Sequence, residues 1–416
     1  MKVQINPHKL ILLCTVMILL LCQGCGNQSG TAVEGETESS AAPVETAATT
    51  PDTDSDQDPA IDLLPENLVN GNEKDYYGDY QETGGEVALV IDFSNVIDNG
   101  FNQAAYEGAR TYACAAGVSY SYYSASQNTE EEYEKTLMTA IENHAKFIIC
   151  AGSHFEQAMG NIQNDYPDIY FLMLDGVPKD ASGKELPIAS NVHCIAYHEE
   201  EAGYLAGYMT VLEGYTNLGF IGGEQLPAVQ RYGMGYLQGI DDAARELGIS
   251  DNVTVNYWYA NTFQPGENVE KVSAEWYESG TQVIFACGGS LYESVLASAE
   301  RFNGLLIGAD TDQSNISELF LTSAMKEIKY SVIMALDDYF ACGNIWSEAL
   351  SGKMISYGAE DKCIGLPLTD NAWRFKKASY ADYTKLLSHI KTGEIEISAS
   401  TSTKLKTSIH VVYQDK

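Results

Sequence analysis

Basic residues are scarce in this chain of 416 residues, in which 24 lysines and arginines stand against 58 aspartates and glutamates, for a formal net charge of −34 at pH 7. Nucleic-acid binding depends on basic side chains that neutralise phosphates, so this balance argues against a nucleic-acid partner. It also argues against a polybasic surface that docks on anionic lipid. Apolar residues nevertheless make up 45% of the chain, which excludes a wholly disordered protein.

The short motifs of common catalytic sites are missing as well. The sequence has no Walker phosphate loop, no HExxH zinc motif and no GxSxG nucleophile elbow. The glycine-rich segment 219–224 lacks the spacing of a dinucleotide-binding loop. These absences favour a binding protein over an enzyme, and we expect neither a metal nor a cofactor.

Long apolar runs are confined to one segment at the N-terminus. Lys2 and Lys9 precede the run 10–22, which is the layout of a secretory signal and is too short for a spanning helix. The small residue Gly24 stands before Cys25, as in a bacterial lipobox, although Cys22 occupies a position where an aliphatic residue is usual. We therefore expect residues 1–24 to be a lipoprotein signal peptide, with Cys25 lipidated and the protein held at the outer face of the cell membrane. An uncleaved anchor is the alternative, and it also leaves the rest of the chain outside the cell.

Residues 25–80 are rich in Gly, Ser, Thr, Ala, Pro and acidic residues, and Lys74 is their only base. Such a segment cannot bury enough apolar surface to offset the entropy of ordering, so we expect a disordered acidic tether. Six cysteines follow it, widely spaced and without a CxxC pair. Cys150, Cys194 and Cys287 lie in apolar runs and are expected to be buried thiols, while the sequence leaves any disulfide pairing open.

From Glu86 onward, apolar strand-like runs alternate with helical patterns, beginning with EVALVIDF at 86–93. Continuous apolar runs are typical of strands covered on both faces, and the alternation predicts an α/β fold of doubly wound parallel sheets. Two successive sets of similar size predict two lobes. We assign 81–195 to the first lobe, with part of 327–352 crossing back to it, 196–326 to the second, and 353–416 to a segment that completes both. A helix is expected from Tyr330 to Leu350.

In open parallel sheets, ligands bind beyond the carboxyl ends of the strands, and two lobes place one cleft between them. Polar residues end several predicted strands here: Asp92, Asp175, Gly289, Asp310 and Lys326. Aspartates in this position are suited to sugar hydroxyls or an ammonium group, although helix capping or a turn is the alternative for each one. Capping is the favoured interpretation for Asp98, which precedes a helix start.

The segment VALVIDFSNVIDNGFNQAAYEGA at 87–109 resembles the opening of the basic membrane protein, or purine nucleoside receptor, family of ABC-transporter substrate-binding lipoproteins. Further matches follow in order from 166 to 366, with the last of them weaker. They are YPDIYFLMLDG, EEEAGYLAGYMT, GFIGGEQLPAVQRYGMGYLQGI, QVIFACGG, LLIGADTDQS, LTSAMK and YGAEDKCIGL. Two departures are Asn99-Gly100, where the family usually has Lys-Ser, and an insertion near 177–190.

This resemblance implies a type I periplasmic-binding-protein-like fold, a purine nucleoside or related small molecule as ligand, and an ABC permease as partner. It also implies the roles of individual residues. The base would be held by Phe101, Asn102 and Asp92, with Phe263 stacking on its other face. Asp310 and Lys326 would bind the ribose hydroxyls, Gly289 would let the backbone approach, and Asp175 is a less certain member of the site.

Three alternatives stay open at this stage. A receptor of the same fold for a sugar or a signalling furanose would tolerate loss of Phe263. An extracellular nucleoside hydrolase also needs aspartates near ribose, but it usually holds a metal with clustered carboxylates, and Asp310 and Asp312 are the only close pair at a strand end. A sensory domain that reports ligand to a kinase is disfavoured by the expected lipid anchor.

Overall fold

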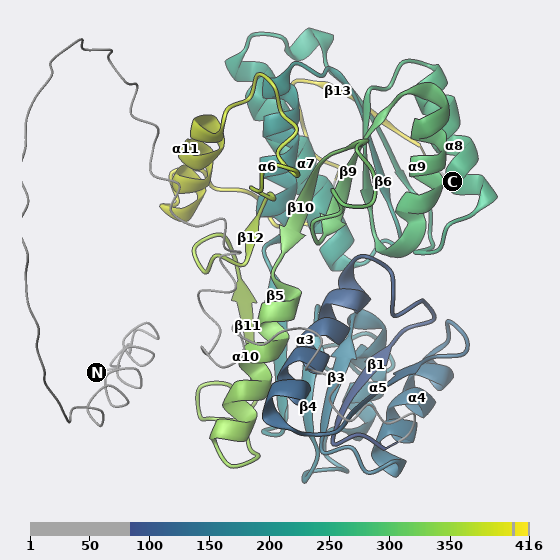
Figure 1. Cartoon of the computed structure of the whole chain (residues 1–416), viewed down its shortest axis with the longest axis vertical. Coiled ribbons are helices and arrows are strands. Elements are labelled where there is room, and N and C mark those ends of the chain that lie inside the picture. The colour runs from purple at the N-terminus through teal and green to yellow at the C-terminus, as the bar shows by residue number, and fades with distance from the viewer. Residues whose placement is uncertain (1–83, 402–403, 415–416) are drawn as a thin grey trace, which may run out of the picture. The chain divides into compact units, whose positions relative to one another are not determined.

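The apolar runs of the sequence form the central strands of the computed structural model, which describes residues 84–401 and 404–414 (Figure 1). The expected signal peptide, the lipidation site Cys25 and the acidic tether lie outside the described residues. All described residues fall within one compact unit. Their strands are divided between two sheets.

The first sheet has six described strands in the order β11-β5-β4-β3-β1-β2, and every neighbouring pair is parallel. Residues of β1 and β3 are buried on both faces, which explains their unbroken apolar sequence. The strands are β1 (Val87–Ile91), β2 (Tyr120–Ser124), β3 (Phe147–Ala151), β4 (Tyr170–Leu174), β5 (Val192–Tyr197) and β11 (Lys353–Tyr357).

Helices cover both faces of this sheet. Leu89 of β1 joins a core cluster with Ala105 of α3, while the next residue, Val90, joins another with Leu137 of α4. This division follows from the two-residue period of a strand. The helix pair α3 (Phe101–Ala116) and α10 (Ile328–Ala341) lies on one face, and α4 (Glu130–Glu142) and α5 (Glu156–Ile162) lie on the other.

The second sheet has seven described strands in the order β12-β10-β9-β8-β6-β7-β13. Only the pairing of β12 with β10 is antiparallel. The strands are β6 (Asn217–Gly222), β7 (Thr254–Tyr259), β8 (Val283–Cys287), β9 (Leu305–Asp310), β10 (Phe320–Lys326), β12 (Ile364–Gly365) and β13 (His410–Tyr413).

This sheet is also covered twice, by α6 (Glu199–Glu213) and α7 (Pro227–Glu246) on one face and by α8 (Glu267–Glu278) and α9 (Tyr292–Phe302) on the other (Figure 1). The remaining described helices are α11 (Tyr380–Lys391), which packs on α6, and the short η3 (Ser153–Phe155), η4 (Ser250–Asn252) and η5 (Gly289–Leu291). The predicted fold class, two doubly wound parallel-sheet units, is therefore confirmed.

The chain passes between the sheets through linked segments. It leaves the first sheet after β5, returns after β10 through α10, and passes again after β11. The crossings are bonded to one another: the His198 amide donates to the Tyr357 carbonyl, and the Ala359 amide donates to the Glu201 carboxylate at 2.6 Å. The domain boundaries drawn from the sequence stay a prediction.

The expected helix from Tyr330 to Leu350 is wrong in its second half. Helix α10 ends at Ala341, and Gly343 (φ 81°) and Asn344 (φ 67°) follow in the left-handed region. These two residues turn the chain so that the Trp346 indole is buried and donates to the Asn191 carbonyl. The tertiary packing of Trp346 therefore overrides the helical pattern.

The prediction of buried thiols in the strands is confirmed, since Cys150, Cys194 and Cys287 are all within the core. Burial raises the pKa of the Cys194 thiol to about 12, so it is unreactive at neutral pH. No helix of residues 84–401 and 404–414 has the length and apolar character that crossing a membrane requires.

Helices α6 and α7 approach closely because glycines face their contact. A Cβ atom on Gly239 would lie 2.1 Å from the Tyr204 carbonyl oxygen, and one on Gly207 would lie 2.4 Å from that of Tyr236. Real Cβ atoms do not approach so closely, so each side chain larger than hydrogen would force the helices apart. This contact holds α6 in place, and α6 carries residues of the site described below.

We expect Gly239→Ala to lower the free energy of unfolding by about 1–3 kcal/mol, even though alanine is the better helix former. Chemical denaturation measures this change. The control is Gly266→Ser, at a position where a Cβ would meet nothing within 4 Å and where serine is a favoured helix cap. Equal stability of Gly239→Ala and the wild type would contradict the close packing of α6 and α7.

Candidate ligand-binding cleft

One pocket lies where strands of the two sheets end. It encloses about 630 Å³ of space free of protein atoms, a figure that includes open solvent. Its walls come from residues that follow β1, β3 and β4 and from the ends of β8, β9 and β10. The lining includes every ligand-binding residue expected from the sequence: Asp92, Phe101, Asn102, Asp175, Phe263, Gly289, Asp310 and Lys326.

The ring of Phe263 lies on a surface made of glycines. A Cβ on Gly223 would be 2.3 Å from the Phe263 ring, one on Gly288 would be 2.7 Å from it, and one on Gly289 would be 2.9 Å from the Phe263 Cβ. Gly289 (φ 49°) is thus needed for the placement of Phe263 as well as for its own backbone conformation. The glycine-rich segment 219–224 has the same explanation: its glycines make room for aromatic rings.

Residues around the start of α3 form the opposite wall. The Asn102 amide donates to the Ser94 hydroxyl at 2.7 Å and, more weakly, to Asp92 Oδ1 at 3.5 Å. Asp98 accepts from the backbone amides of Gly100, Asn102 and Gln103, so its expected capping role is confirmed. Asp98 also lines the pocket, and burial raises its pKa to about 6.

The Lys326 ammonium lies in a cluster of three carboxylates. Its Nζ is 2.5 Å from Asp175 Oδ2, 3.1 Å from Glu199 Oε1 and 3.5 Å from Asp310 Oδ1. Its side chain is 2% exposed, and Nζ also lies 4.7 Å from the centre of the Phe101 ring. Burial disfavours the charged form, but the adjacent carboxylates of Asp175 and Glu199 outweigh it and raise the pKa of Lys326. The lysine is therefore a permanent cation inside the pocket.

Both aspartates of this cluster have unusual backbone conformations. Asp175 (φ 58°), immediately after β4, and Asp310 (φ 68°), the last residue of β9, are in the left-handed region. Strained backbone of this kind concentrates at functional sites. Burial raises the pKa of Asp175 to about 7 although the Lys326 charge opposes this, and Asp175 Oδ1 is buried without a hydrogen-bond partner. Asp175 thus retains an unused acceptor in the pocket.

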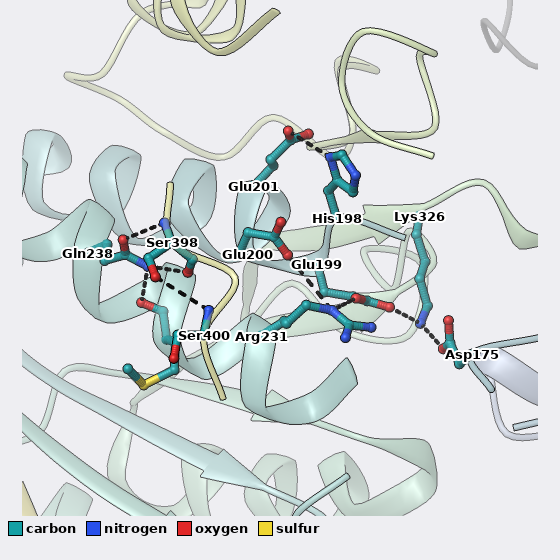
Figure 2. A network of polar contacts seen from close by, with 11 residues as sticks. Asp175, His198, Glu199, Glu200, Glu201, Arg231, Gln238, Lys326, Ser398 and Ser400 are labelled. Atoms are coloured by element: carbon teal, nitrogen blue, oxygen red, sulfur yellow. Dashed lines mark hydrogen bonds and ion pairs between the residues drawn. The ribbon is translucent and has the colours of Figure 1, made fainter. Parts of the chain in front are cut away.

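The cluster continues into α6 and α7 (Figure 2). Arg231 Nε lies 2.6 Å from Glu199 Oε2 and 3.8 Å from Glu200 Oε2. Burial would raise the pKa of Glu199, but the charges of Lys326 and Arg231 outweigh burial and lower it. Burial raises the pKa of Glu200 to about 7, and its Oε2 is a buried acceptor with no hydrogen bond. The sequence interpretation missed Glu199 and Arg231, because they lie on helices rather than at strand ends.

His154 of η3 is a further lining residue that sequence reasoning missed. Its Nδ1 is 3.3 Å from Asp92 Oδ2 and its Nε2 is 3.0 Å from Glu224 Oε2. It follows Gly152 and Ser153 directly after β3, so the strand-end rule applied to the other residues could have found it.

Asn99 joins the loop before α3 to the second sheet's side of the pocket. Its amide donates to the Tyr292 hydroxyl at 2.9 Å, and its carbonyl accepts from Thr311 and Gln313 at 2.8 and 2.9 Å. This is the position where the sequence departs from the Lys-Ser of the resembling family. The substitution therefore lies at a contact across the pocket mouth.

The arrangement combines flat apolar walls with a polar end. Phe101 and Phe263 provide ring surfaces, and the Lys326 cluster provides a cation and acceptors. Within residues 84–401 and 404–414, no group of three His, Cys, Asp or Glu side chains is placed to hold a metal ion. Such a pocket is suited to enclosing a flat polar solute.

Comparison with solved structures identifies the class of fold. A solute-binding protein of an ABC transporter system from Aeropyrum pernix superimposes with a TM-score of 0.65 at 19% identity, covering 76% of this chain and 94% of that one. A transcriptional activator of the comK gene from Bacillus halodurans superimposes with a TM-score of 0.55 at 17% identity, covering 74% and 98%. The fold is that of type I periplasmic-binding-protein-like solute-binding proteins.

Residues 86–401 match the family described as ABC transporter substrate-binding protein PnrA-like, and the chain belongs to that family. The ABC transporter nucleoside-binding protein BmpA of Lactococcus lactis is 26% identical over 310 residues, covering 69% of this chain and 82% of that protein. Basic membrane protein B of Borreliella burgdorferi is 25% identical over 298 residues, covering 68% and 80%. The predicted family is thus confirmed, and the protein is an ABC transporter substrate-binding protein.

We expect Glu200→Gln to flatten the pH dependence of stability. Because the pKa of Glu200 is raised from 4.5 to about 7 in the folded protein, the folded state keeps a proton that the unfolded state loses between these values. Its contribution to the free energy of unfolding therefore falls as pH rises through this window. Glutamine stays neutral, so the variant gains stability over the wild type near pH 8.

Chemical denaturation at several pH values tests this expectation, with Glu131→Gln on the exposed face of α4 as the control. A Glu200→Gln profile parallel to that of the wild type would show that Glu200 is charged throughout and would contradict the description of the network.

Proposed function

We propose that this protein binds a purine nucleoside, or a closely related solute, in the cleft and delivers it to an ABC permease. The observation that carries this proposal is the convergence of eight residues, chosen from the sequence for contacts to a base and a ribose, on one pocket. They come from segments more than 230 residues apart in the chain, from Asp92 to Lys326.

The base occupies the part of the pocket lined by Phe101 and Phe263. Aromatic rings favour flat heterocycles through stacking and through the apolar area that they bury. Asn102 and Asp92 lie beside Phe101 and supply hydrogen-bonding groups for the edge of the base. The ribose occupies the end near Lys326, where Asp310 and the unused Oδ1 of Asp175 accept hydrogen bonds from its hydroxyls.

A lipid anchor on Cys25 would hold the protein at the outer face of the cell membrane, next to its permease. This part of the proposal is supported by the lipobox-like sequence at 21–25 and by the names of relatives. An uncharacterized lipoprotein of Pyrococcus furiosus is 22% identical over 308 residues, covering 71% of this chain and 73% of that protein. The nucleoside assignment is supported in the same way by the name of the Lactococcus lactis relative.

Hydrolysis of a nucleoside is the less supported alternative. It would require paired carboxylates for a metal, but Asp310 lines the pocket whereas Asp312 is absent from the lining and accepts from the Ser314 amide. The carboxylates near Asp310 are paired with Lys326 and, in the case of Glu199, also with Arg231. This arrangement supports retention of an unmodified ligand.

Phe263→Ala and Asp310→Ala should each weaken nucleoside binding at least about tenfold, equivalent to about 1.4 kcal/mol. The first variant loses the ring surface, and the second removes an acceptor and leaves part of the Lys326 charge unpaired. Isothermal titration calorimetry with adenosine, guanosine and inosine measures the change, with hexoses as competing candidates.

Two conservative variants serve as controls for fold and shape. Phe263→Leu keeps an apolar side chain and loses only stacking, and Asp310→Asn keeps the size of the side chain. Unchanged affinity in both alanine variants would place the ligand elsewhere. If titration with a hexose gives a binding heat and titration with every purine nucleoside gives none, the ligand is a sugar and the nucleoside proposal is wrong.

Nucleoside 5′-monophosphates should bind at least about tenfold more weakly than the corresponding nucleosides. The pocket is lined by Asp92, Asp98, Asp175 and Asp310, and its cations Lys326 and His154 are already paired with carboxylates. A phosphate would therefore meet negative charge without a free cation. Calorimetry with adenosine and its 5′-monophosphate at two salt concentrations tests this, and equal affinities would contradict it.

A further inference from the structure

His154 contacts both sides of the cleft. It belongs to η3, after a strand of the first sheet, while Glu224 follows β6 of the second. The imidazole lies between Asp92 Oδ2 at 3.3 Å and Glu224 Oε2 at 3.0 Å, and its side chain is 12% exposed. Glu224 also accepts from Asn128 Nδ2 at 3.1 Å, another residue from the side of the first sheet.

Aromatic contacts hold the imidazole in this orientation. Its ring stacks on Tyr133 of α4, with centroids 5.2 Å apart and planes at 23°. The Phe263 ring meets its edge, with centroids 6.2 Å apart and planes at 78°. The histidine therefore has little freedom to turn away from either carboxylate, and it also touches the ring proposed to stack on the base.

The charges around His154 are almost all negative. Asp92 faces it from the end of β1, Glu224 from the loop after β6, and Glu130 from α4, from which Tyr133 also faces it. Burial would lower the pKa of His154, but its hydrogen bonds to Asp92 and Glu224 outweigh burial and raise it to about 9. Both ring nitrogens are therefore donors at neutral pH, and each has an acceptor.

We propose that His154 bridges the two sides of the cleft, and we call its pairs with Asp92 and Glu224 the clasp. The clasp positions Asp92 for the ligand and, through Glu224, slows the opening of the cleft. Opening that separates the segment after β3 from the segment after β6 must break the His154–Glu224 pair. A charged hydrogen bond in a partly desolvated site is stronger than an exposed ion pair, so its loss favours the open form. Through Glu224, the clasp thus controls ligand release.

The same histidine orients Asp92. Asp92 Oδ2 accepts from His154, while its Oδ1 accepts from Ser94 and Asn102. The carboxylate is fixed from both ends, with its orientation set before a ligand arrives. Pre-organisation of this kind raises affinity because less freedom is lost on binding.

The pH signature of the clasp distinguishes it from the Asn99 contact. Asn99 also joins the two sides of the pocket, but its bonds to Tyr292, Thr311 and Gln313 involve neutral groups. Loss of the His154 proton weakens only the clasp. Ligand release should therefore accelerate as pH rises through about 9, whereas the Asn99 contact contributes equally across this range.

The test uses stopped-flow release of adenosine, which has no group that titrates between about pH 8 and pH 10. In the wild type the release rate should increase at least about threefold across this window. His154→Gln should release adenosine at least about tenfold faster near pH 7.5 and show no change across the window. Asn99→Ala should also release faster but keep the wild-type pH dependence, and His389→Gln, on α11 and outside the pocket lining, should match the wild type.

The release experiment depends on the proposed function, because it requires bound adenosine. A second measurement is therefore needed that does not depend on the ligand. NMR titration of the imidazole, assigned by its absence in His154→Gln, should give a pKa near 9 that falls in Glu224→Gln. Failure of all nucleosides to bind, with this titration as expected, would overturn the proposed function and leave the clasp standing. Nucleoside binding with identical release from His154→Gln and wild type, or an ordinary His154 pKa, would overturn the clasp.

Discussion

The structure depends on one buried cation, Lys326, and on the three carboxylates that surround it. Asp175 ends a strand of the first sheet, Asp310 and Lys326 end strands of the second, and Glu199 begins the helix after the first crossing. Removal of Lys326 would leave its carboxylate partners buried without their shared cation, at a cost of about 3–5 kcal/mol. This cluster therefore ties the strand ends of both sheets together at the place where the ligand is proposed to bind.

The cluster also explains why charged groups and aromatic rings lie side by side in the cleft. Lys326 must be surrounded by acceptors, which remain available for hydroxyl groups, while the glycines at 223, 288 and 289 let Phe263 lie against the backbone. Few solutes combine a flat heterocycle with adjacent hydroxyls, and a nucleoside is one of them. These two local constraints, charge satisfaction and close packing, shape the cleft in which a nucleoside is proposed to bind.

Much of the fold and several residues of the cleft could be predicted from the sequence, because the central strands are continuous apolar runs that end at polar residues. The aspartates after β1 and β4 lie at strand ends, where the pattern placed them. Glu199 and Arg231 could not be predicted in the same way, since a charged residue on a helix usually faces solvent and only the approach of α6 to α7 brings Arg231 against the buried Glu199. The helix expected to reach Leu350 ended early because Trp346 found a buried partner outside the helix. Local patterns thus locate strand ends, whereas long-range pairing decides which charges become internal.

The central claim is that the cleft holds a purine nucleoside with its ribose at the Lys326 cluster. A crystal structure of the protein grown with guanosine tests it most directly. The account predicts density for the base against Phe101 and Phe263, and ribose hydroxyls within hydrogen-bond distance of Asp310 and Lys326. Density for a hexose carried through purification, or guanosine bound outside the cleft, would contradict it.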